Sequence, residues 1–217
     1  MNGRFITFEG GEGVGKTTQL RRTADWLRTK GIDVVETREP GGTPQAEELR
    51  QILLAREGDP MPPAAELLLM FAARSLHLEQ LILPALERGA WVLCDRFTDA
   101  TYAYQGGGRR LDTRDIDALV QIVHPRRQPD LTLLLDAPVE IGLERALSRN
   151  GPSGQDRFEA EQRQFFDRVR DVYLDRASRD PRRFRMIDAA TDSDRVLVAI
   201  QQALQPLLAI RTQGKTS

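Results

Sequence analysis

The sequence predicts an α/β fold in which a five-stranded parallel sheet is covered by helices on both faces. A glycine-rich turn at 10–17 follows a short apolar run and precedes a helical stretch. Runs typical of strands then alternate with segments of helical spacing along the whole chain. One run, 131–136 (LTLLLD), is almost wholly apolar, as expected of a central strand in a parallel sheet.

Five runs are predicted strands because each is short, apolar or β-branched, and bounded by turn residues. They are the run around Phe5–Phe8, then 32–37, 91–95, 131–136 and 184–188.

The segments between the strands repeat apolar residues at helical spacing. The predicted helices are 18–30, Pro44–Ala55, 64–88, 111–123, 139–147, 157–177 and 193–210. Pro84 predicts a kink or a boundary inside the third of them. Residues 98–110 are expected to begin as a helix and then to open into a glycine loop.

Two segments are too rich in glycine, proline or serine for regular structure. REPGGT (38–43) follows the second predicted strand, so it lies on the same edge of the sheet as the glycine-rich turn. SRNGPSGQ (148–155) follows a predicted helix. The end of the chain, about 211–217, is expected to be frayed.

Length and composition predict one soluble domain over residues 1–217. A net charge of -1 argues against general binding to nucleic acid or membranes. The single cysteine, Cys94, excludes an internal disulfide, and with only two histidines a zinc cluster is not expected. No run approaches the ~20 apolar residues of a membrane span, and no signal segment precedes the first strand. We therefore expect a cytoplasmic protein.

The turn at 10–17 carries the first candidate site. Gly10, Gly15, Lys16 and Thr17 fit the pattern G-x-x-x-x-G-K-[ST]. The glycines let backbone N–H groups converge on an anion, the lysine brings a positive charge to the β and γ phosphates, and the threonine hydroxyl completes Mg²⁺ coordination. A chance glycine-rich turn is the alternative, but its context favours a phosphate-binding loop and an α/β fold of the P-loop NTPase type.

Asp95, at the end of the third predicted strand, is the second candidate. A P-loop fold usually holds its Mg²⁺-associated carboxylate there, and Arg96 follows at once. Such a pair can hold the metal and steer a phosphate. A surface Asp–Arg pair is the alternative.

Three arginines, Arg145, Arg149 and Arg157, surround the irregular segment 148–155. Phosphoryl transfer develops charge, which a mobile arginine can neutralise once the substrates are bound. This predicts a mobile lid at about 148–158, with a solvated basic loop as the alternative.

Phe71 and Arg74 stand about one helical turn apart, so they can stack on a flat base and bond its exocyclic oxygen. An aromatic residue of the core is the alternative for Phe71. His77, His124 and Cys94 are expected to be structural.

Five motifs together resemble the thymidylate kinase family. FEGGEGVGKTT, TREPGGT, LLMFAARS, DRFTDATYAYQGGGR and DRFE occur in that order. The resemblance implies a homodimer with a parallel five-stranded core and a lid, which transfers the γ-phosphoryl group of ATP to dTMP to give dTDP, with Mg²⁺ as cofactor.

The resemblance also implies roles for individual residues. Those expected to bind ATP are Gly10, Gly11, Glu12, Gly13, Val14, Gly15, Lys16, Thr17, Thr18 and Arg145. Those expected to bind dTMP are Glu12, Arg38, Pro40, Phe71, Arg74, Arg96, Thr101, Tyr104, Gln105 and Phe158. Those expected to take part in catalysis are Glu12, Lys16, Asp95, Arg96, Arg149 and Arg157, with Thr17 and Asp95 at the metal.

The sequence departs from the family's pattern in one place. The stacking aromatic usually stands four residues before the arginine, where this chain has Met70, and Phe71 stands three before Arg74. We predict that Phe71 stacks on the base, with Met70 as the alternative. Some members of the family carry a basic residue in the phosphate loop, and this chain does not. The chain therefore resembles the other members, in which arginines of the lid take over the catalytic role of that residue.

Two other functions remain as alternatives. A deoxynucleoside kinase would need a carboxylate base for the sugar hydroxyl, and Glu12 or Glu39 could supply it. Arginines on the acceptor side argue for an acceptor that already carries phosphate. A P-loop switch protein would need a positioned catalytic glutamine or acid, and a second nucleotide pocket would be superfluous to it.

Overall fold

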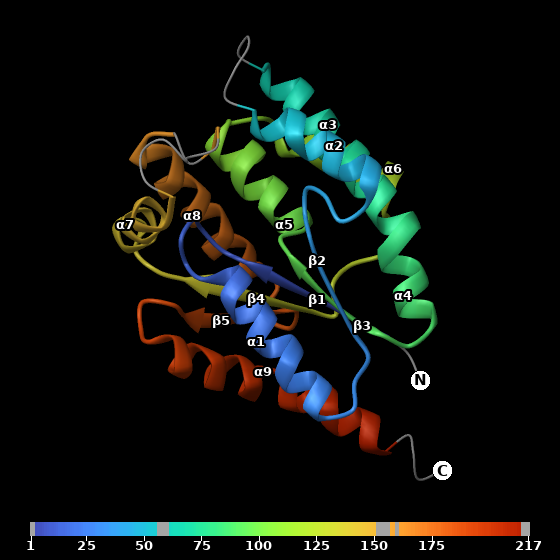
Figure 1. Cartoon of the computed structure of the whole chain (residues 1–217). Helices are drawn as coiled ribbons and strands as arrows, with labels where there is room; N and C mark the ends of the chain where they lie inside the picture. Colours follow the sequence, from blue (N-terminus) through green and yellow to red (C-terminus); the bar gives the residue numbers. More distant parts are fainter. Residues whose placement is uncertain (1–2, 56–60, 151–156, 159–160, 214–217) are drawn as a thin grey trace.

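A twisted sheet of five parallel strands forms the centre of the molecule (Figure 1). The computed structural model describes residues 3–55, 61–150, 157–158 and 161–213. The strands are β1 (Arg4–Glu9), β2 (Val34–Arg38), β3 (Trp91–Asp95), β4 (Leu131–Asp136) and β5 (Phe184–Asp188). Their order across the sheet is β2-β3-β1-β4-β5. All five predicted strands and the α/β fold class are confirmed.

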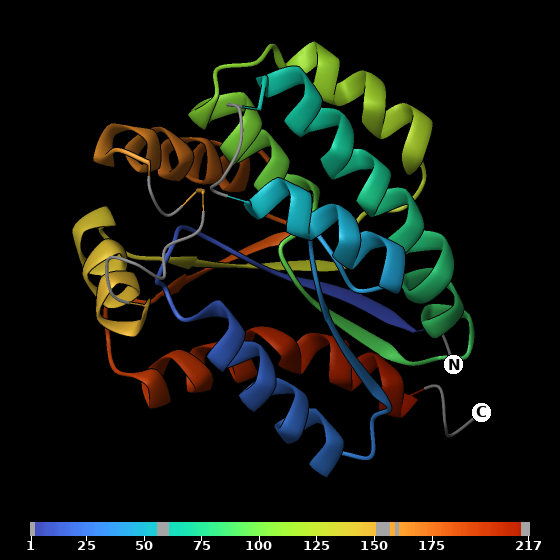
Figure 2. The same ribbon diagram turned by 45° about the horizontal axis from the view of Figure 1, so that its top comes forward.

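Helices cover both faces of the sheet, as predicted (Figure 2). One face carries α1 (Lys16–Thr29) and α9 (Ser193–Gln213). The other is covered by α2 (Pro44–Leu54), α3 (Pro63–His77), η1 (Leu78–Ile82), α4 (Leu83–Glu87), α5 (Thr98–Thr101), η2 (Tyr102–Gly108), α6 (Thr113–Val123) and α8 (Arg163–Arg179). The remaining helix, α7 (Val139–Asn150), packs against α8 beside the end of β4.

The central strands β1, β3 and β4 are mainly apolar because helices bury them from both sides. On one face, Phe8 and Leu133 pack with Leu27 of α1 and Ile200 of α9. On the other, Phe5 packs against Phe97 and the η1–α4 segment. Burying large side chains on both faces removes the polar alternation that a half-exposed strand would show.

The register of the parallel strands brings the predicted site residues to one edge of the sheet. Phe8 pairs with Asp95, and Asp95 pairs with Arg38 on the next strand. The carboxyl ends of β1, β3 and β2 therefore stand side by side. The loops that follow them meet at the same edge, as expected of the carboxyl ends of parallel strands.

The predicted helix 64–88 is continuous but irregular, because a π-helical stretch, η1, joins α3 to α4. Pro84 lies two residues beyond the end of this stretch, in the first turn of α4. Proline has no N–H to donate to the carbonyl four residues before it, so the backbone ahead of it changes its hydrogen-bonding pattern. The irregularity that the sequence placed at Pro84 thus begins at Leu78.

The glycines at 106–108 do not open into a loop, contrary to expectation. They continue the helix as the π-helix η2, which packs along α8. A Cβ on Gly107 would lie 2.9 Å from the Arg168 carbonyl, and one on Gly108 would overlap the Phe165 ring. Here the glycines serve close approach between two helices and not a turn.

The segment around the predicted lid differs from the prediction at both ends. The helix α7 continues to Asn150, three residues past the predicted end, and α8 begins at Arg163 and not at 157. Arg157 and Phe158 lie in a turn before α8. The helix α9 continues through 211–213, where the sequence predicted a frayed end. The predicted lid residues 151–156 and the rest of that end, 214–217, lie outside the described residues.

One described helix, Pro63–Glu87, is long and apolar enough to cross a membrane by length and composition alone. The core helix of a soluble protein passes the same test. Several of its large side chains, among them Leu67, Phe71 and Ile82, are buried in the core.

Candidate active site

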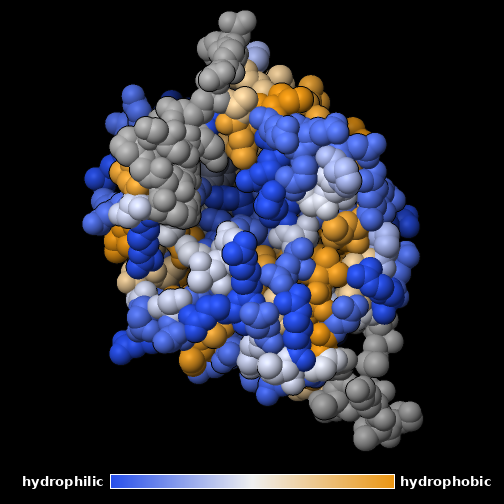
Figure 3. Space-filling view, viewed as in Figure 1, coloured by the Kyte–Doolittle hydropathy of each residue, from blue (hydrophilic) through white to orange (hydrophobic). Residues whose placement is uncertain are grey.

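A cavity of about 940 Å³ opens at the carboxyl edge of β1, β2 and β3. Figure 3 shows this face of the molecule hollowed, with mainly hydrophilic side chains around the hollow. The predicted site residues that line it are Glu12, Gly13, Gly15, Lys16, Thr17, Thr18, Arg38, Pro40, Arg74, Asp95, Arg96, Thr101, Tyr104, Gln105 and Phe158. The cavity thus joins the phosphate loop to the segments that the sequence assigned to an acceptor.

The phosphate loop lies between β1 and α1, with the N-terminus of α1 directed at the cavity. Lys16 Nζ donates to the Gly11 carbonyl over 2.6 Å. Burial, followed by repulsion from Arg96, lowers the pKa of Lys16 to about 8. Backbone amides, the helix N-terminus and this lysine form an anion site of the expected kind.

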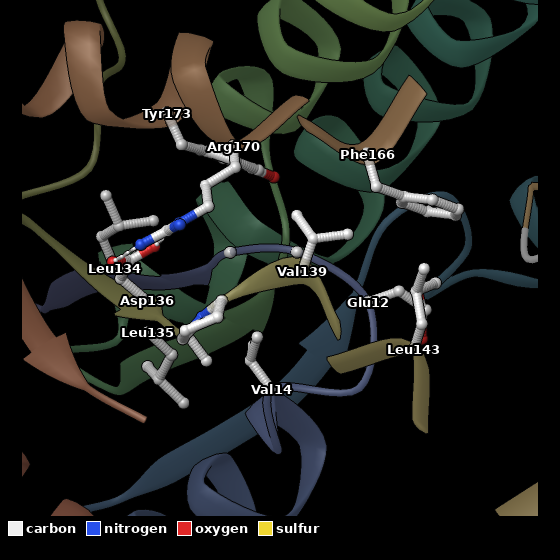
Figure 4. Close-up of a pocket in the computed structure, with 14 residues that line it drawn as sticks. Glu12, Val14, Leu134, Leu135, Asp136, Val139, Leu143, Phe166, Arg170 and Tyr173 are labelled. Atoms are coloured by element: carbon white, nitrogen blue, oxygen red, sulfur yellow. Dashed lines mark hydrogen bonds and ion pairs between the residues drawn. The ribbon is translucent and has the colours of Figure 1, made fainter. Parts of the chain in front are cut away.

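The loop is held tightly against its support. Gly13 has a φ of 67°, and a Cβ there would overlap the carbonyl of Gly142 on α7. Figure 4 shows the space behind the loop, with Val14 on one side and the bidentate Arg170–Asp136 pair on the other. That space measures about 20 Å³, room for about one water molecule, so it is too small for a nucleotide. The residues that line it pack behind the loop. The predicted residues Gly10, Gly11 and Val14 line it instead of the main cavity.

Thr17 and Asp95 meet beside the phosphate loop. The Thr17 hydroxyl donates to Asp95 Oδ2 over 2.6 Å. Hydroxyl and carboxylate oxygens are the donors that Mg²⁺ prefers, and this ion commonly takes its remaining ligands from water and substrate phosphates. Within the described part of the chain no three His, Cys, Asp or Glu side chains converge, so a metal held mainly by protein ligands finds no site there. The residues present fit Mg²⁺.

Arg96 is fixed from several sides at the centre of the cavity. It adopts the left-handed region, with φ of 71°. Its guanidinium donates to the Gly10 carbonyl (3.0 Å), the Tyr173 hydroxyl (3.3 Å) and Glu12 Oε2 (3.2 Å). It also lies 4.6 Å from the centre of the Tyr104 ring. These contacts hold a rigid, charged donor beside the phosphate loop.

Glu9, the last residue of β1, supports this arrangement and was not singled out from the sequence. Its Oε1 accepts the Phe97 N–H over 2.7 Å, and its Oε2 accepts the Tyr173 hydroxyl over 2.8 Å. Burial, reinforced by Asp99, raises its pKa to about 8. The signal in the sequence that could have identified Glu9 is its position as an acidic residue directly after the apolar run of the first strand.

Arg74 reaches the acceptor end of the cavity from α3. Its Nε donates to Glu39 Oε2 over 2.7 Å, and its Nη2 donates to the Thr101 hydroxyl over 2.9 Å and to the Phe97 carbonyl. Its Nη1 is buried without a partner among the described residues. The two N–H groups of this nitrogen are therefore unsatisfied among the described residues.

Glu39 anchors Arg74 and is itself anchored. Its Oε1 lies 3.0 Å from His77 Nδ1, and His77 Nε2 lies 2.7 Å from the Thr37 hydroxyl. Burial would raise the pKa of this carboxyl, but Arg74 and His77 outweigh it, so the pKa lies below its ordinary value. His77 is structural, as expected, and Pro40 follows Glu39 through a cis peptide bond.

Phe71 does not reach the cavity. It is 2% exposed and packs with Leu67, Ile116 and Val120, with its ring 4.7 Å from the Arg74 guanidinium carbon. Met70 lines the cavity in its place. One residue is 100° of helical rotation, which turns the aromatic ring into the core and the methionine towards the acceptor end.

Arg157 contacts residues of α2 and α3. Its Nη2 donates to Glu66 Oε2 over 2.6 Å, and its Nε donates to the Leu53 carbonyl over 3.0 Å. Its guanidinium carbon also lies 4.8 Å from the Phe158 ring centre. None of these partners belongs to the phosphate loop, although the sequence predicts that Arg157 neutralises charge on the transferred phosphoryl group.

The other two arginines of this region lie elsewhere. Arg145 donates to the Ala189 carbonyl over 2.8 Å, away from the residues that line the main cavity. Arg149 is part of α7, and its side chain lies outside the described residues.

Several lining residues were missed. Arg50 of α2 donates to the Pro40 carbonyl over 2.8 Å, and Glu47 accepts from Arg38 over 2.8 Å. Arg21 and Leu54 also line the cavity. These residues lie in predicted helices, where nothing in the spacing distinguishes them from ordinary surface positions.

Known proteins resemble the chain over nearly its whole length. A family model described as thymidylate kinase matches residues 8–200. A thymidylate kinase of Chromohalobacter salexigens is 57% identical over 203 residues, which is 93% of each chain. One of Teredinibacter turnerae is 54% identical over 208 residues, 96% of this chain and 100% of the relative.

A solved structure agrees with these relatives. The crystal structure of thymidylate kinase from Ehrlichia chaffeensis superimposes with a TM-score of 0.76 at 35% identity, covering 94% of this chain and 99% of that one. Fold, phosphate loop and near-complete matches point the same way, so the chain belongs to the thymidylate kinase family.

Proposed function

We propose that the cavity holds ATP and dTMP together while the chain carries out the reaction of its family. That reaction transfers the γ-phosphoryl group of ATP to dTMP and gives ADP and dTDP. The observation that carries the proposal is one continuous cavity with an anion site at one end and oriented base donors at the other. Arg96 stands between the two ends.

The phosphate loop is the donor site. Its amides and Lys16 bind the β and γ phosphates, and Thr17 and Asp95 hold Mg²⁺, which neutralises phosphate charge. Glu12, Gly13, Gly15 and Thr18 line the cavity around them.

Arg96 binds the acceptor phosphate. Because phosphate is already a nucleophile near neutral pH, the protein aligns the two groups, neutralises charge and excludes water. Glu12 orients Arg96 and approaches the sugar of dTMP, whereas Arg38 and Pro40 line the acceptor side of the cavity.

The base lies at the far end, where Arg74 donates from Nη1 to a thymine carbonyl. Thr101, Tyr104, Gln105 and Phe158 surround base and sugar. Met70 packs on the base. The buried ring of Phe71 acts indirectly, because it supports the guanidinium of Arg74.

The arginines around the predicted lid have separate roles. The side chain of Arg145, on α7, reaches the loop after β5 and contacts the adenine end of ATP. Arg149 neutralises charge during transfer. Arg157 stabilises the acceptor end of the cavity through its ion pair with Glu66. For Arg157 to act in catalysis, its guanidinium must leave Glu66 and bind a phosphate group.

The enzyme works as a homodimer in the cytoplasm. Leu68 of α3 and Ile122 of α6 expose 58% and 76% of their surface on adjacent helices, which favours an interface there. The single cysteine is buried and free, which suits a reducing compartment.

An acceptor panel tests this function. The purified protein is incubated with ATP, Mg²⁺ and either dTMP, dUMP, thymidine or no acceptor, and ADP is measured. We expect rapid ADP release with dTMP. Equal ATP turnover without an acceptor would instead favour a switch protein, and turnover with thymidine alone would favour a deoxynucleoside kinase.

A further inference from the structure

Glu66 is a buried acid of α3 that contacts neither nucleotide in the proposed reaction and enters it only as a partner of Arg157. Its side chain is fully buried, with 0% exposure. Gln105 Nε2 donates to it over 2.7 Å, Arg157 Nη2 over 2.6 Å and Arg109 Nε over 3.2 Å. Arg109 reaches onward to Glu161. The two guanidiniums balance the buried charge, since an unpaired carboxylate would be costly there.

This carboxylate permits only one orientation of the Gln105 amide. A carboxylate paired with guanidiniums accepts hydrogen bonds and has none to donate. A reversed amide would therefore place two oxygens at the 2.7 Å now spanned by the hydrogen bond. Oε1 of Gln105 faces away from Glu66, and among the described residues no hydrogen bond engages it.

Arg74 presents the opposite polarity at the same end of the cavity. Glu39 and Thr101 occupy its Nε and Nη2, and its Nη1 is the donor left over within the described structure. Arg74 and Gln105 both line the cavity. A molecule bound there meets one fixed donor and one fixed acceptor.

We propose that Glu66 is a positioning residue that fixes the amide of Gln105 and so makes the acceptor end select thymine or uracil over cytosine. Thymine offers a carbonyl beside a ring N–H, which complements a donor and an acceptor. Cytosine offers an amino group beside a bare ring nitrogen, which is the reverse pattern. The inference rests on the proposed function, in which Arg74 and Gln105 contact the base.

Glu66→Gln is the direct test, because the variant keeps the shape but can turn either an oxygen or a nitrogen towards Gln105. We expect the ratio of kcat/KM for dTMP to that for dCMP to fall at least about tenfold. The KM for dTMP should rise more than kcat falls. Turnover of dTMP by the unaltered protein tests the proposed function separately.

Asp99→Asn is the matched control. Asp99 is also a buried acid with two arginine partners, Arg176 and Arg183, but neither partner lines the cavity, whereas Glu66 bonds Gln105, which does. We expect this variant to lower the unfolding midpoint and to leave the dTMP-to-dCMP ratio unchanged. If it reproduces the lower ratio of Glu66→Gln, or if a folded Glu66→Gln keeps the original ratio, the proposal is overturned.

Two further variants guard against loss of folding. Glu66→Asp keeps the charge for the arginines but withdraws its oxygen from Gln105, and its ratio should also fall. In a Gln105→Met background, Glu66→Gln should lower the ratio no further, because the residue through which it acts is gone. An unchanged ratio in the first variant, or a further loss in the second, overturns the proposal.

Discussion

Lys16 is a buried ammonium whose pKa, about 8, is lowered first by desolvation and then by Arg96. Because this value lies below the ordinary one, the side chain loses its charge as the pH rises through about 8. We therefore expect kcat/KM for ATP, which reports the free enzyme, to decline above that pH. The decline in kcat should begin at higher pH, since bound phosphates favour the ammonium.

Initial rates at varied ATP between about pH 6.5 and 9.5 measure both profiles. Lys16→Ala is the control, with turnover reduced by orders of magnitude and no corresponding step in the residual rate. A wild-type kcat/KM that stays level across this range would contradict a lysine charge that weakens near pH 8.

Glu9 affects stability in a similarly specific way. Its pKa is raised from 4.5 to about 8, mainly by burial, so in the folded protein it keeps a proton that the unfolded chain has released. The stability gained from that proton is complete below about pH 4.5 and is lost as the pH rises through 8. The loss between these values should approach about 1.4 kcal/mol per pH unit.

Glu9→Gln isolates this contribution, because glutamine can bond Phe97 and Tyr173 without titrating. We expect the stability of the wild type relative to the variant to fall steadily from pH 5 to pH 8. Urea denaturation at several pH values measures the difference. A constant difference would mean that Glu9 does not hold a proton in the folded state.

At the scale of elements, the contact between η2 and α8 depends on Gly108. A Cβ there would overlap the Phe165 ring, whereas a Cβ on Gly106 would meet Ile116 at 3.4 Å, close to ordinary contact. We expect Gly108→Ala to cost about 1–3 kcal/mol of stability through overpacking. It should also raise the KM for dTMP, because η2 carries Tyr104 and Gln105.

Gly106→Ala is the matched control for that effect. It makes the same substitution two residues away in the same helix, and we expect a small change in both quantities. Thermal unfolding and acceptor kinetics on the two variants decide the point. Equal behaviour of the two alanines would show that packing against Phe165 does not limit the position of η2.

The elements themselves were largely predictable because their signals are local. An apolar run such as 131–136 reports burial on both faces, and the spacing of Leu20, Ala24 and Leu27 reports one helical face. The π-helix η2 was not predictable, because Gly107 and Gly108 are required by Phe165 and Arg168, about 60 residues away in the chain. Local turn propensity points to a loop instead.

The same distinction between local signals and contacts of distant residues applies to the candidate site. Lys16, Thr17 and Asp95 follow from the motif and from the parallel register. Glu66 could not be found from the sequence, because its importance comes from Gln105, Arg109 and Arg157, which lie on other elements. Phe71 shows the limit of spacing arguments, since a shift of one residue decides between the core and the cavity.

At the scale of the whole molecule, the proposed dimer makes a further prediction. Leu68 and Ile122 lie on adjacent helices, and beneath them Leu67 and Ile116 belong to one buried cluster. Replacing these two exposed side chains by glutamates should oppose the burial of this face against a second copy, because unpaired buried charges are costly. We expect the unaltered chain to sediment as a dimer, at twice its mass of 24.5 kDa.

The double variant Leu68→Glu/Ile122→Glu should shift that species to the monomer. Val198→Glu is the control, because Val198 is similarly exposed (50%) but lies on α9, across the sheet from α3 and α6. Sedimentation velocity at several concentrations distinguishes the two variants, and circular dichroism establishes that both are folded. A dimer that survives the double substitution but dissociates in Val198→Glu would move the interface to the α1–α9 face.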